Sequence, residues 1–393
     1  MNPIIFYIDV NSAYLSWTAI RLLAQGESVD IRTIPSAIGG DISKRRGVIL
    51  AKSIPAKAFQ VTTGEPITDA LKKCPHLHIV QPDHSYYQQC SHQMLDLLSQ
   101  YSPDIHPYSI DECFMTYVSF PEDGGSPVTG AHIIRKHIRD SLGFTVNIGI
   151  STNRLLAKMA SDFTKPDRVH TLFPEEIPQK MWPLPVRDLF MVGKSSARTL
   201  ELLGIKTIGD LAHTDPAILT SHLKSHGQTI WEYANGLEYT PIDAKRHTSK
   251  GIGNSTTLSS DVTERAAALK VLLSLSESVS SRLRRAGQLA GMVSVEIKFH
   301  NFHTVSHQPL LRTPSQSTDT IYSYACRLFD ELWDGTPIRL LGIRTSKLSG
   351  QDTVQMNLFE PETSQKLRKL DKALDDIRRK YGKDAVVRGS FLK

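Results

Sequence analysis

The chain has 393 residues, of which 40% are hydrophobic and 22% are charged. Because single cores rarely grow beyond about 250–300 residues, this length predicts several domains, and the composition excludes a disordered chain. The net charge is +6, but residues 81–160 hold eight Asp and Glu against five Lys and Arg, whereas the last 33 residues hold ten basic against five acidic side chains. An acidic centre between basic ends suits a protein that binds cations centrally and a polyanion peripherally, although ordinary surface variation gives the same pattern.

The sequence shows no sign of a membrane protein or of a secreted one. No apolar run approaches the ~18 residues that a membrane span needs. The short apolar run at the N-terminus contains Asp9 and has no basic region before it, so it is not a signal peptide. The four cysteines form no CxxC pair, which argues against a disulfide framework. We therefore expect a cytoplasmic protein without a membrane partner.

Several elements are expected in the first half of the chain. The apolar run at residues 4–8 predicts a buried strand that ends at Asp9. Further strands are expected at residues 29–36, 47–53, 77–81 and 145–150, and helices at residues 11–26, 84–101, 129–142 and 152–163. Asp111 and Glu112 lie at a tight junction between two more strands. From residue 77 the order strand, helix, two strands, helix, strand matches a ferredoxin-like split βαβ plan.

The second half of the chain predicts two different kinds of structure. Residues 167–240 are expected to be helical, with short turns at glycines. Residues 241–250 are polar, contain Pro241 and predict a linker. Residues 251–350 mix strands with helices at 263–286 and 318–333, which predicts a separate α+β domain.

Three carboxylates stand out as candidate metal ligands. Asp9 ends the first strand, and Asp111-Glu112 follows another apolar strand. If these side chains converge, they repel one another and need cations. Ligands that are all oxygen favour Mg²⁺ or Mn²⁺ over zinc. The alternative is that Asp9 caps a turn and that Asp111-Glu112 belongs to a solvated loop.

The segments around these carboxylates resemble a known family. FYIDVNSAY and YSIDECF resemble the two palm motifs of the Y-family translesion DNA polymerases. In order along the chain, further segments resemble the fingers (RGVILAKSIPAKAFQV), the end of the palm (IGISTNRLLAKMASDFTKPD), the thumb (LPVRDLFMVGKSSARTLELLGIKTIGDLA) and the start of the little finger (KGIGNSTTLSSDV). The DVN of the first motif looks closer to the polymerase V catalytic subunit than to polymerase IV.

The resemblance implies an α+β fold of the right-hand polymerase type, with a ferredoxin-like palm, small fingers, a helical thumb with a helix-hairpin-helix, and a separate α+β little finger domain. The implied boundaries are palm at 1–26 and 80–166, fingers at 27–79, thumb at 167–240, linker at 241–250, little finger at 251–350, and a clamp-binding tail with a C-terminal helix at 351–393.

The resemblance also implies roles for individual residues. Asp9 and Asp111 would bind two Mg²⁺ ions (or Mn²⁺), Glu112 would bind the catalytic one, and the carbonyl of Val10 would complete the other. Tyr14 falls at the steric gate that excludes ribonucleotides, whereas its spacing alone suits a core residue. The positions implied to contact the triphosphate are Lys57 and Lys165. Ile54 and Ala51 depart from the family pattern, because many members carry a tyrosine and a hydroxyl residue there.

The implied function is error-prone, template-directed DNA synthesis on primer–template DNA with deoxynucleoside triphosphates, as part of DNA repair. Gly193 and Lys194 would hold a DNA phosphate at the helix-hairpin-helix. In the tail, Gln355, Leu358 and Phe359 resemble a peptide that binds the sliding clamp, and the helix after it carries an apolar stripe that needs a surface. The alternatives are a catalytically silent, polymerase-like accessory protein that binds DNA, and a structure-specific nuclease.

Overall fold

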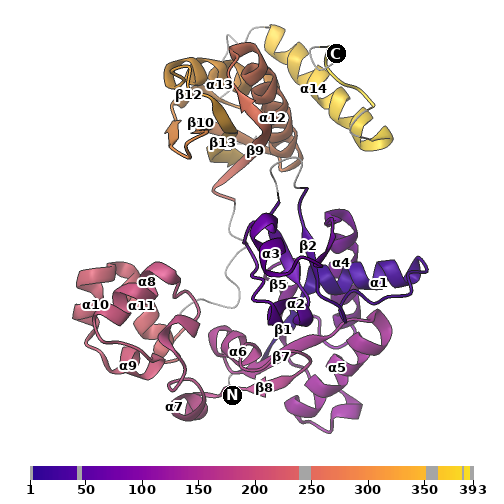
Figure 1. Cartoon of the computed structure of the whole chain (residues 1–393), viewed down its shortest axis with the longest axis vertical. Helices are drawn as coiled ribbons and strands as arrows, with labels where there is room; N and C mark the ends of the chain where they lie inside the picture. Colours follow the sequence, from indigo (N-terminus) through magenta and orange to yellow (C-terminus); the bar gives the residue numbers. More distant parts are fainter. Residues whose placement is uncertain (1–2, 42–46, 239–248, 351–361, 383–384, 390–393) are drawn as a thin grey trace. The chain divides into compact units, whose positions relative to one another are not determined.

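The computed structural model describes residues 3–41, 47–238, 249–350, 362–382 and 385–389 (Figure 1). These residues form two compact units. The first contains the described residues up to 238 except Asp41, and the second contains Asp41 and the described residues from 249 onward.

The first unit is built on a five-stranded sheet with the order β5-β6-β1-β7-β8. Its central strand is β1 (Ile5–Val10), and all six residues of this strand are buried. On either side, β6 (Glu112–Thr116) and β7 (Val146–Ser151) pair antiparallel with β1. The outer strands are β5 (Ile105–Pro107) and β8 (Val169–Thr171), and β8 runs parallel to β7.

The two faces of this sheet carry different helices. Because side chains alternate along a strand, Phe6 and Ile8 lie on one face of β1 and Tyr7 and Asp9 on the other. The first face packs in one core with three helices, α1 (Ala13–Ala24), α4 (His84–Leu98) and α5 (Pro127–Leu142). On the second face, Tyr7 packs with Phe114 and with Ala157 of α6 (Arg154–Ser161). Asp9 therefore shares its face with α6.

A second, three-stranded sheet lies in the same unit, with the order β3-β2-β4. It consists of β2 (Ser36–Gly39), β3 (Ile49–Lys52) and β4 (His78–Val80), together with α2 (Ile54–Ala58) and α3 (Ile67–Lys73). The strand expected at 77–81 thus pairs with β2 and not with the central sheet. The predicted split βαβ order was wrong in this first strand.

The rest of the first unit is mostly helical, as expected. One exception is β8, which joins the central sheet and was missed because it has only three residues. The helices are α7 (Ile177–Lys180), α8 (Lys194–Leu202), α9 (Ile208–His213), α10 (Pro216–Leu223) and α11 (Ser225–Ala234). There are also three 3₁₀ turns, η2 (Pro121–Asp123), η3 (Pro174–Glu176) and η4 (Val186–Asp188).

The second unit has its own sheet and core. Its sheet has the order β11-β10-β13-β9, and β12 pairs with β10. The strands are β9 (Gly251–Val262), β10 (Gln288–Phe299), β11 (Thr304–His307), β12 (Leu310–Ser315) and β13 (Ile338–Gly350). The helices are α12 (Arg265–Arg285), α13 (Thr318–Leu332) and α14 (Glu362–Tyr381), and residues of α12 and α13 share the core with the sheet.

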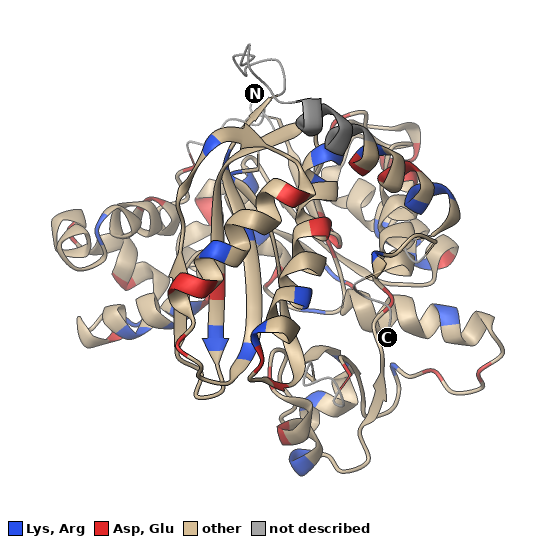
Figure 2. Ribbon diagram, turned by 90° about the horizontal axis from the view of Figure 1, so that it is seen from above, with Lys and Arg blue, Asp and Glu red and all other residues tan. Residues whose placement is uncertain are grey.

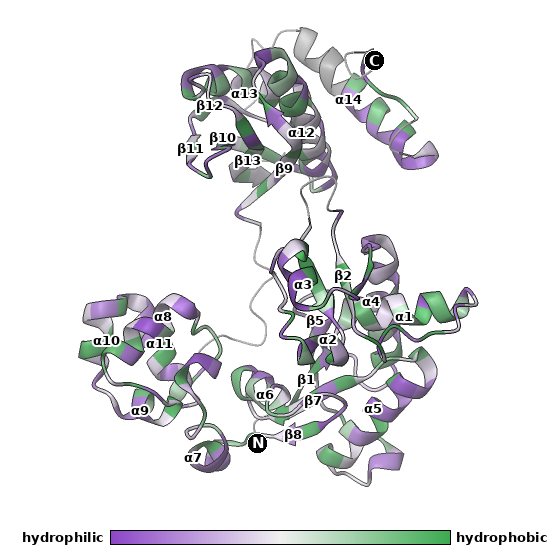
Figure 3. Ribbon diagram, viewed as in Figure 1, coloured by the Kyte–Doolittle hydropathy of each residue, from purple (hydrophilic) through white to green (hydrophobic). Residues whose placement is uncertain are grey.

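Hydropathy and charge follow this architecture. The fully buried strands β1 and β7 are mainly hydrophobic, whereas α5 alternates hydrophobic and hydrophilic residues because only one of its faces is buried (Figure 3). Basic and acidic residues are interspersed, and most lie on helices and loops (Figure 2). Across the described residues, every helix is too short or too polar to cross a membrane.

Candidate active site

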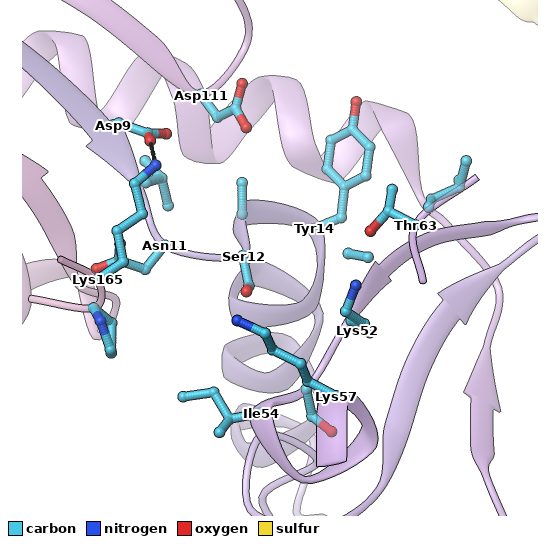
Figure 4. A pocket seen from close by; sticks show the side chains of 16 residues that line it. Asp9, Asn11, Ser12, Tyr14, Lys52, Ile54, Lys57, Thr63, Asp111 and Lys165 are labelled. Atoms are coloured by element: carbon cyan, nitrogen blue, oxygen red, sulfur yellow. Dashed lines mark hydrogen bonds and ion pairs between the residues drawn. The ribbon is translucent and has the colours of Figure 1, made fainter. Parts of the chain in front are cut away.

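A cavity of about 520 Å³ opens beside the end of β1 (Figure 4). Four stretches that are distant in the sequence line it: the end of β1 with the start of α1, the β3–α2 connection, the turn before β6, and the segment after α6. The lining includes six residues singled out above, namely Asp9, Val10, Tyr14, Lys57, Asp111 and Lys165. The fold thus gathers most of the predicted catalytic and substrate-binding residues around one space.

Asp9 and Asp111 lie at one end of the cavity (Figure 4). Asp9 is nearly buried, with 8% of its surface exposed. The amide of Val10 donates to the carbonyl of Asp111 at 3.1 Å, which ties the turn before β6 to β1. Glu112 does not line the cavity, but it is paired with Asp9 in the register of β1 and β6, so the two side chains lie on the same face.

Lysines neutralise two of the three carboxylates. Lys165 binds Asp9, and it also pairs with Asp162 at 2.8 Å. Lys158 binds Glu112 at 3.0 Å. The side chain of Asp111 accepts a hydrogen bond from the Ser109 hydroxyl at 2.6 Å.

Burial and these partners shift the ionisation of the site. Burial raises the pKa of Asp9 to about 6, although Lys165 opposes this shift. Burial also acts on Glu112, but hydrogen bonds from Tyr7 and Lys158 prevail and lower the pKa of Glu112. For Lys165, the desolvation that burial causes is outweighed by Asp9 and Asp162, which raise the pKa of this lysine. Asp9 is therefore the carboxylate that gains most from a stronger cation.

The predicted metal ligands are close but not gathered. Over the parts of the chain that the structure describes, no three His, Cys, Asp or Glu side chains form a group that could hold a metal ion. The ion pairs explain this, because Asp9 turns to Lys165 and Glu112 turns to Lys158.

Lys158 is a site residue that sequence reasoning missed. Only 12% of its side chain is exposed. Its ammonium donates to the Tyr7 hydroxyl and lies 4.3 Å from the Tyr7 ring centre, 5.1 Å from that of Tyr108 and 5.3 Å from that of Phe190. Such cation–π contacts favour a desolvated lysine that also has a carboxylate partner. The signal was a lysine on the same helical segment as Lys165, but nothing local linked it to Glu112.

Asn11 and Asn147 hold the segment that carries Lys165. The Asn11 side chain donates to Asn147 Oδ1 at 3.1 Å and accepts from the amide of Asp167 at 2.9 Å. Asn147, which is fully buried on β7, donates to the carbonyl of Thr164 at 2.7 Å. Asn11 thus has a structural role, and Asn147 was missed because its partners lie far away in the sequence.

Tyr14 projects into the cavity from α1 (Figure 4). Its ring stacks on that of Tyr87 at 4.6 Å with an interplanar angle of 10°. Tyr87 is fully buried, and its hydroxyl lies 2.8 Å from that of Thr18. Tyr14 is therefore partly a core residue and partly a wall of the cavity, which unites the two alternatives that its spacing left open.

The opposite wall comes from the small sheet and α2. Lys57 on α2 is exposed and extends toward Ser12, and Lys52 on β3 lies near Thr63 (Figure 4). Ile54 is 66% exposed, although it is a large apolar side chain. Lys52 was not predicted as a site residue, and it adds positive charge to this wall.

Other predicted residues lie outside the cavity. Gly193 precedes α8, which begins at Lys194, and the first amides of a helix lack intrahelical partners. The clamp-binding residues Gln355, Leu358 and Phe359 lie outside the described residues.

Comparisons with known proteins agree with this geometry. Residues 8–162 match the impB/mucB/samB family, residues 249–358 match the C-terminal domain of that family, and residues 174–205 match the IMS family HHH motif. DNA polymerase IV of Clostridium acetobutylicum is 48% identical over 393 residues, covering 100% of this chain and 99% of the relative. The chain belongs to this family, the Y family of DNA polymerases.

Other Y-family relatives are more distant. DNA polymerase IV of Clostridium kluyveri is 34% identical, and DNA polymerase IV 1 of Bacillus subtilis is 33% identical; each match covers 100% of this chain, and 99% and 94% of the relative. A solved Y-family DNA polymerase chimera, Dbh-Dpo4(243-245)-Dbh, superposes with a TM-score of 0.75 at 20% identity, covering 88% of this chain and 100% of the chimera's chain. The predicted α+β right-hand fold is confirmed.

The expected closeness to the polymerase V branch is not supported. The relatives at 48%, 34% and 33% identity are all named DNA polymerase IV. That expectation rested on the DVN of the first motif, where Asn11 bonds to Asn147 and to the segment after α6. A residue with such a local role says little about the branch of the family.

Proposed function

We propose that this chain is a template-directed DNA polymerase that extends primers past damaged template bases. The primer 3′-hydroxyl attacks the α-phosphorus of a deoxynucleoside triphosphate, and pyrophosphate leaves. The observation that carries this proposal is that Asp9, Asp111 and Lys165 surround one cavity in a chain that matches a DNA polymerase IV along its whole length. These residues also argue against a catalytically silent accessory protein.

We assign the divalent-ion site to Asp9, Asp111, Glu112 and the carbonyl of Val10. The donors fit Mg²⁺, since all are oxygens, and Asp9 is a buried carboxylate whose lysine partner leaves its pKa raised. Two such ions supply positive charge where negative charge develops around the transferred phosphorus. The contribution of the chain is to hold the carboxylates at the ends of paired strands.

The nucleotide would occupy the cavity between the two walls. Lys57 and Lys165 offer ammonium groups to the triphosphate, and Lys52 adds charge beside them. Tyr14, held by its stack on Tyr87, would lie under the sugar and exclude a 2′-hydroxyl. Ile54 offers no hydrogen bond at its exposed position, so we expect fewer triphosphate contacts than in relatives with a tyrosine there.

Primer–template DNA would be held through its phosphates. We assign the palm to residues 1–26 and 80–166, the fingers to 27–79, the thumb to 167–240 and the little finger to 251–350. In the thumb, Gly193 and Lys194 begin α8 and would contact a backbone phosphate without selecting a sequence. In the tail, Gln355, Leu358 and Phe359 would bind the sliding clamp and so raise the effective concentration of the enzyme at primer ends.

Primer extension with Mg²⁺ tests this function. Asp111→Asn and Glu112→Gln keep the shape of each side chain and remove its charge, so extension should fall by about 10²-fold or more while DNA binding changes little. An exposed control, Asp188→Asn, should extend normally. Undiminished extension by both site variants would refute the assignment, and cleavage of labelled DNA without nucleotides would favour a nuclease.

A further inference from the structure

Lys165 has a carboxylate partner where the proposed function requires it to be available to a nucleotide. Its ammonium binds Asp9 and pairs with Asp162 at 2.8 Å. The side chain is 38% exposed and lies at the acidic end of the cavity (Figure 4). A lysine held by two carboxylates is a weaker ligand for phosphate than a free one, because those carboxylates repel the phosphate.

Only the side chain of Lys165 is free to move. The backbone on both sides is fixed: Asn147 accepts from the amide of Arg168 at 3.3 Å and donates to the carbonyl of Thr164, and Asn11 binds the amide of Asp167. The stem of a lysine has four rotatable bonds, so the ammonium can leave Asp9 without any change in the fold.

Lys158 differs in this respect. It is only 12% exposed, and the rings of Tyr7, Tyr108 and Phe190 enclose its ammonium. Leaving Glu112 would expose these rings and forfeit the cation–π contacts. Of the two lysines on the catalytic carboxylates, Lys165 is therefore the one built to exchange.

We propose that Lys165 is an exchangeable counter-ion, which neutralises Asp9 until a divalent cation displaces it and frees it for the triphosphate. This inference rests on the proposed function of the site. The cation and the ammonium need the same oxygens of Asp9 and repel each other, so binding of one disfavours binding of the other. Since a freed Lys165 attracts phosphate, cation and nucleotide each strengthen the binding of the other.

Competitive acetylation of the wild-type protein, read by mass spectrometry, tests the exchange without DNA or nucleotide. Titration with Mg²⁺ at constant ionic strength should raise the labelling rate of Lys165 by about threefold or more, because its ammonium loses its main partner. The matched control is Lys180, which is 40% exposed and pairs with Glu176 at 2.5 Å. Its rate should stay constant. If Mg²⁺ changes Lys165 no more than Lys180, the proposal fails.

A second measurement uses Mn²⁺ binding, followed by electron paramagnetic resonance on the same DNA-free protein. Lys165→Met removes the competing charge, so Mn²⁺ should bind about tenfold more tightly, whereas Lys180→Met should match the wild type. Unchanged or weaker binding in Lys165→Met would overturn the proposal. Primer extension by the wild type separates the two ideas: an active enzyme without exchange keeps the proposed function, and exchange in an inactive protein keeps only this inference.

Discussion

Tyr14 shows how one side chain can serve both packing and specificity. The stack on Tyr87 fixes one face of its ring, and the buried position of Tyr87 makes that support rigid. The rest of the ring borders the cavity. A gate that excludes a single hydroxyl needs such support, because a mobile ring would yield to the larger sugar.

Replacing Tyr14 should therefore change the choice of sugar. Tyr14→Ala removes the ring, and ribonucleotide incorporation relative to deoxynucleotide incorporation should rise by at least about tenfold in single-nucleotide insertion assays. Tyr14→Phe keeps the ring and should retain the discrimination. An unaltered ratio in Tyr14→Ala would leave this residue with a packing role alone.

At the scale of elements, the approach of α6 to β7 sets the geometry of the site. Gly149 lies in the middle of β7, where a Cβ atom would come within 1.9 Å of the carbonyl oxygen of Ala157. Only glycine lets the helix come this close. The same helix carries Lys158 and leads to Lys165, so the spacing of α6 and β7 governs both lysines.

Gly149→Ala should consequently push α6 away from the sheet. Because backbone atoms cannot give way cheaply, we expect a loss of about 1–3 kcal/mol of stability in urea unfolding, together with slower primer extension. Gly350→Ala is the control, since a Cβ there meets nothing within 4 Å. Equal stability of the two variants would contradict the close packing.

The C-terminal helix α14 attaches to its unit mainly by charge. Asp371 is buried and lies 3.1 Å from Arg284 of α12, which also binds Asp375 at 2.6 Å. In contrast, Leu370 and Tyr381 of the predicted apolar stripe are 54% and 67% exposed. The stripe was expected to need a surface; the helix instead packs through polar residues, because α12 presents an arginine there.

Arg284→Met should release α14. The variant leaves Asp371 buried without its partner, which costs more than solvating it, so the helix should detach. Faster hydrogen exchange in residues 370–381 would report this release. Arg379→Met serves as the control, because Arg379 is 79% exposed and pairs only locally with Asp376. If exchange in α14 stays slow in Arg284→Met, the ion pairs do not hold the helix.

At the scale of the whole molecule, the sequence predicted what the motifs encode and missed what depends on distant partners. Asp9, Asp111 and Tyr14 were found because each lies in a recognisable segment, and the structure brings them together. Lys158 and Asn147 act through contacts between segments, which no local pattern reveals. The sheet to which β4 belongs could not be predicted either, because pairing with β2 depends on tertiary register.

DNA binding by the entire chain should depend strongly on salt. Phosphate contacts release counterions, so a protein that makes several of them loses about 10³-fold in affinity or more between about 50 and 200 mM salt. Fluorescence anisotropy with two unrelated primer–template sequences should give similar curves. A flat salt response, or affinities that differ greatly between the sequences, would show that phosphates are not the main contact.

The central position of β1 has a consequence for how the site breathes. Both edges of this strand are hydrogen-bonded, to β6 and to β7, and all six of its residues are buried. Local opening reaches such a strand last, whereas the short strands β2, β3 and β4 can open at lower cost. The amides of Tyr7 and Ile8 should therefore survive deuterium exposure longest, so that one wall of the cavity fluctuates while the carboxylate of Asp9 stays anchored in the slowest-opening part of the unit.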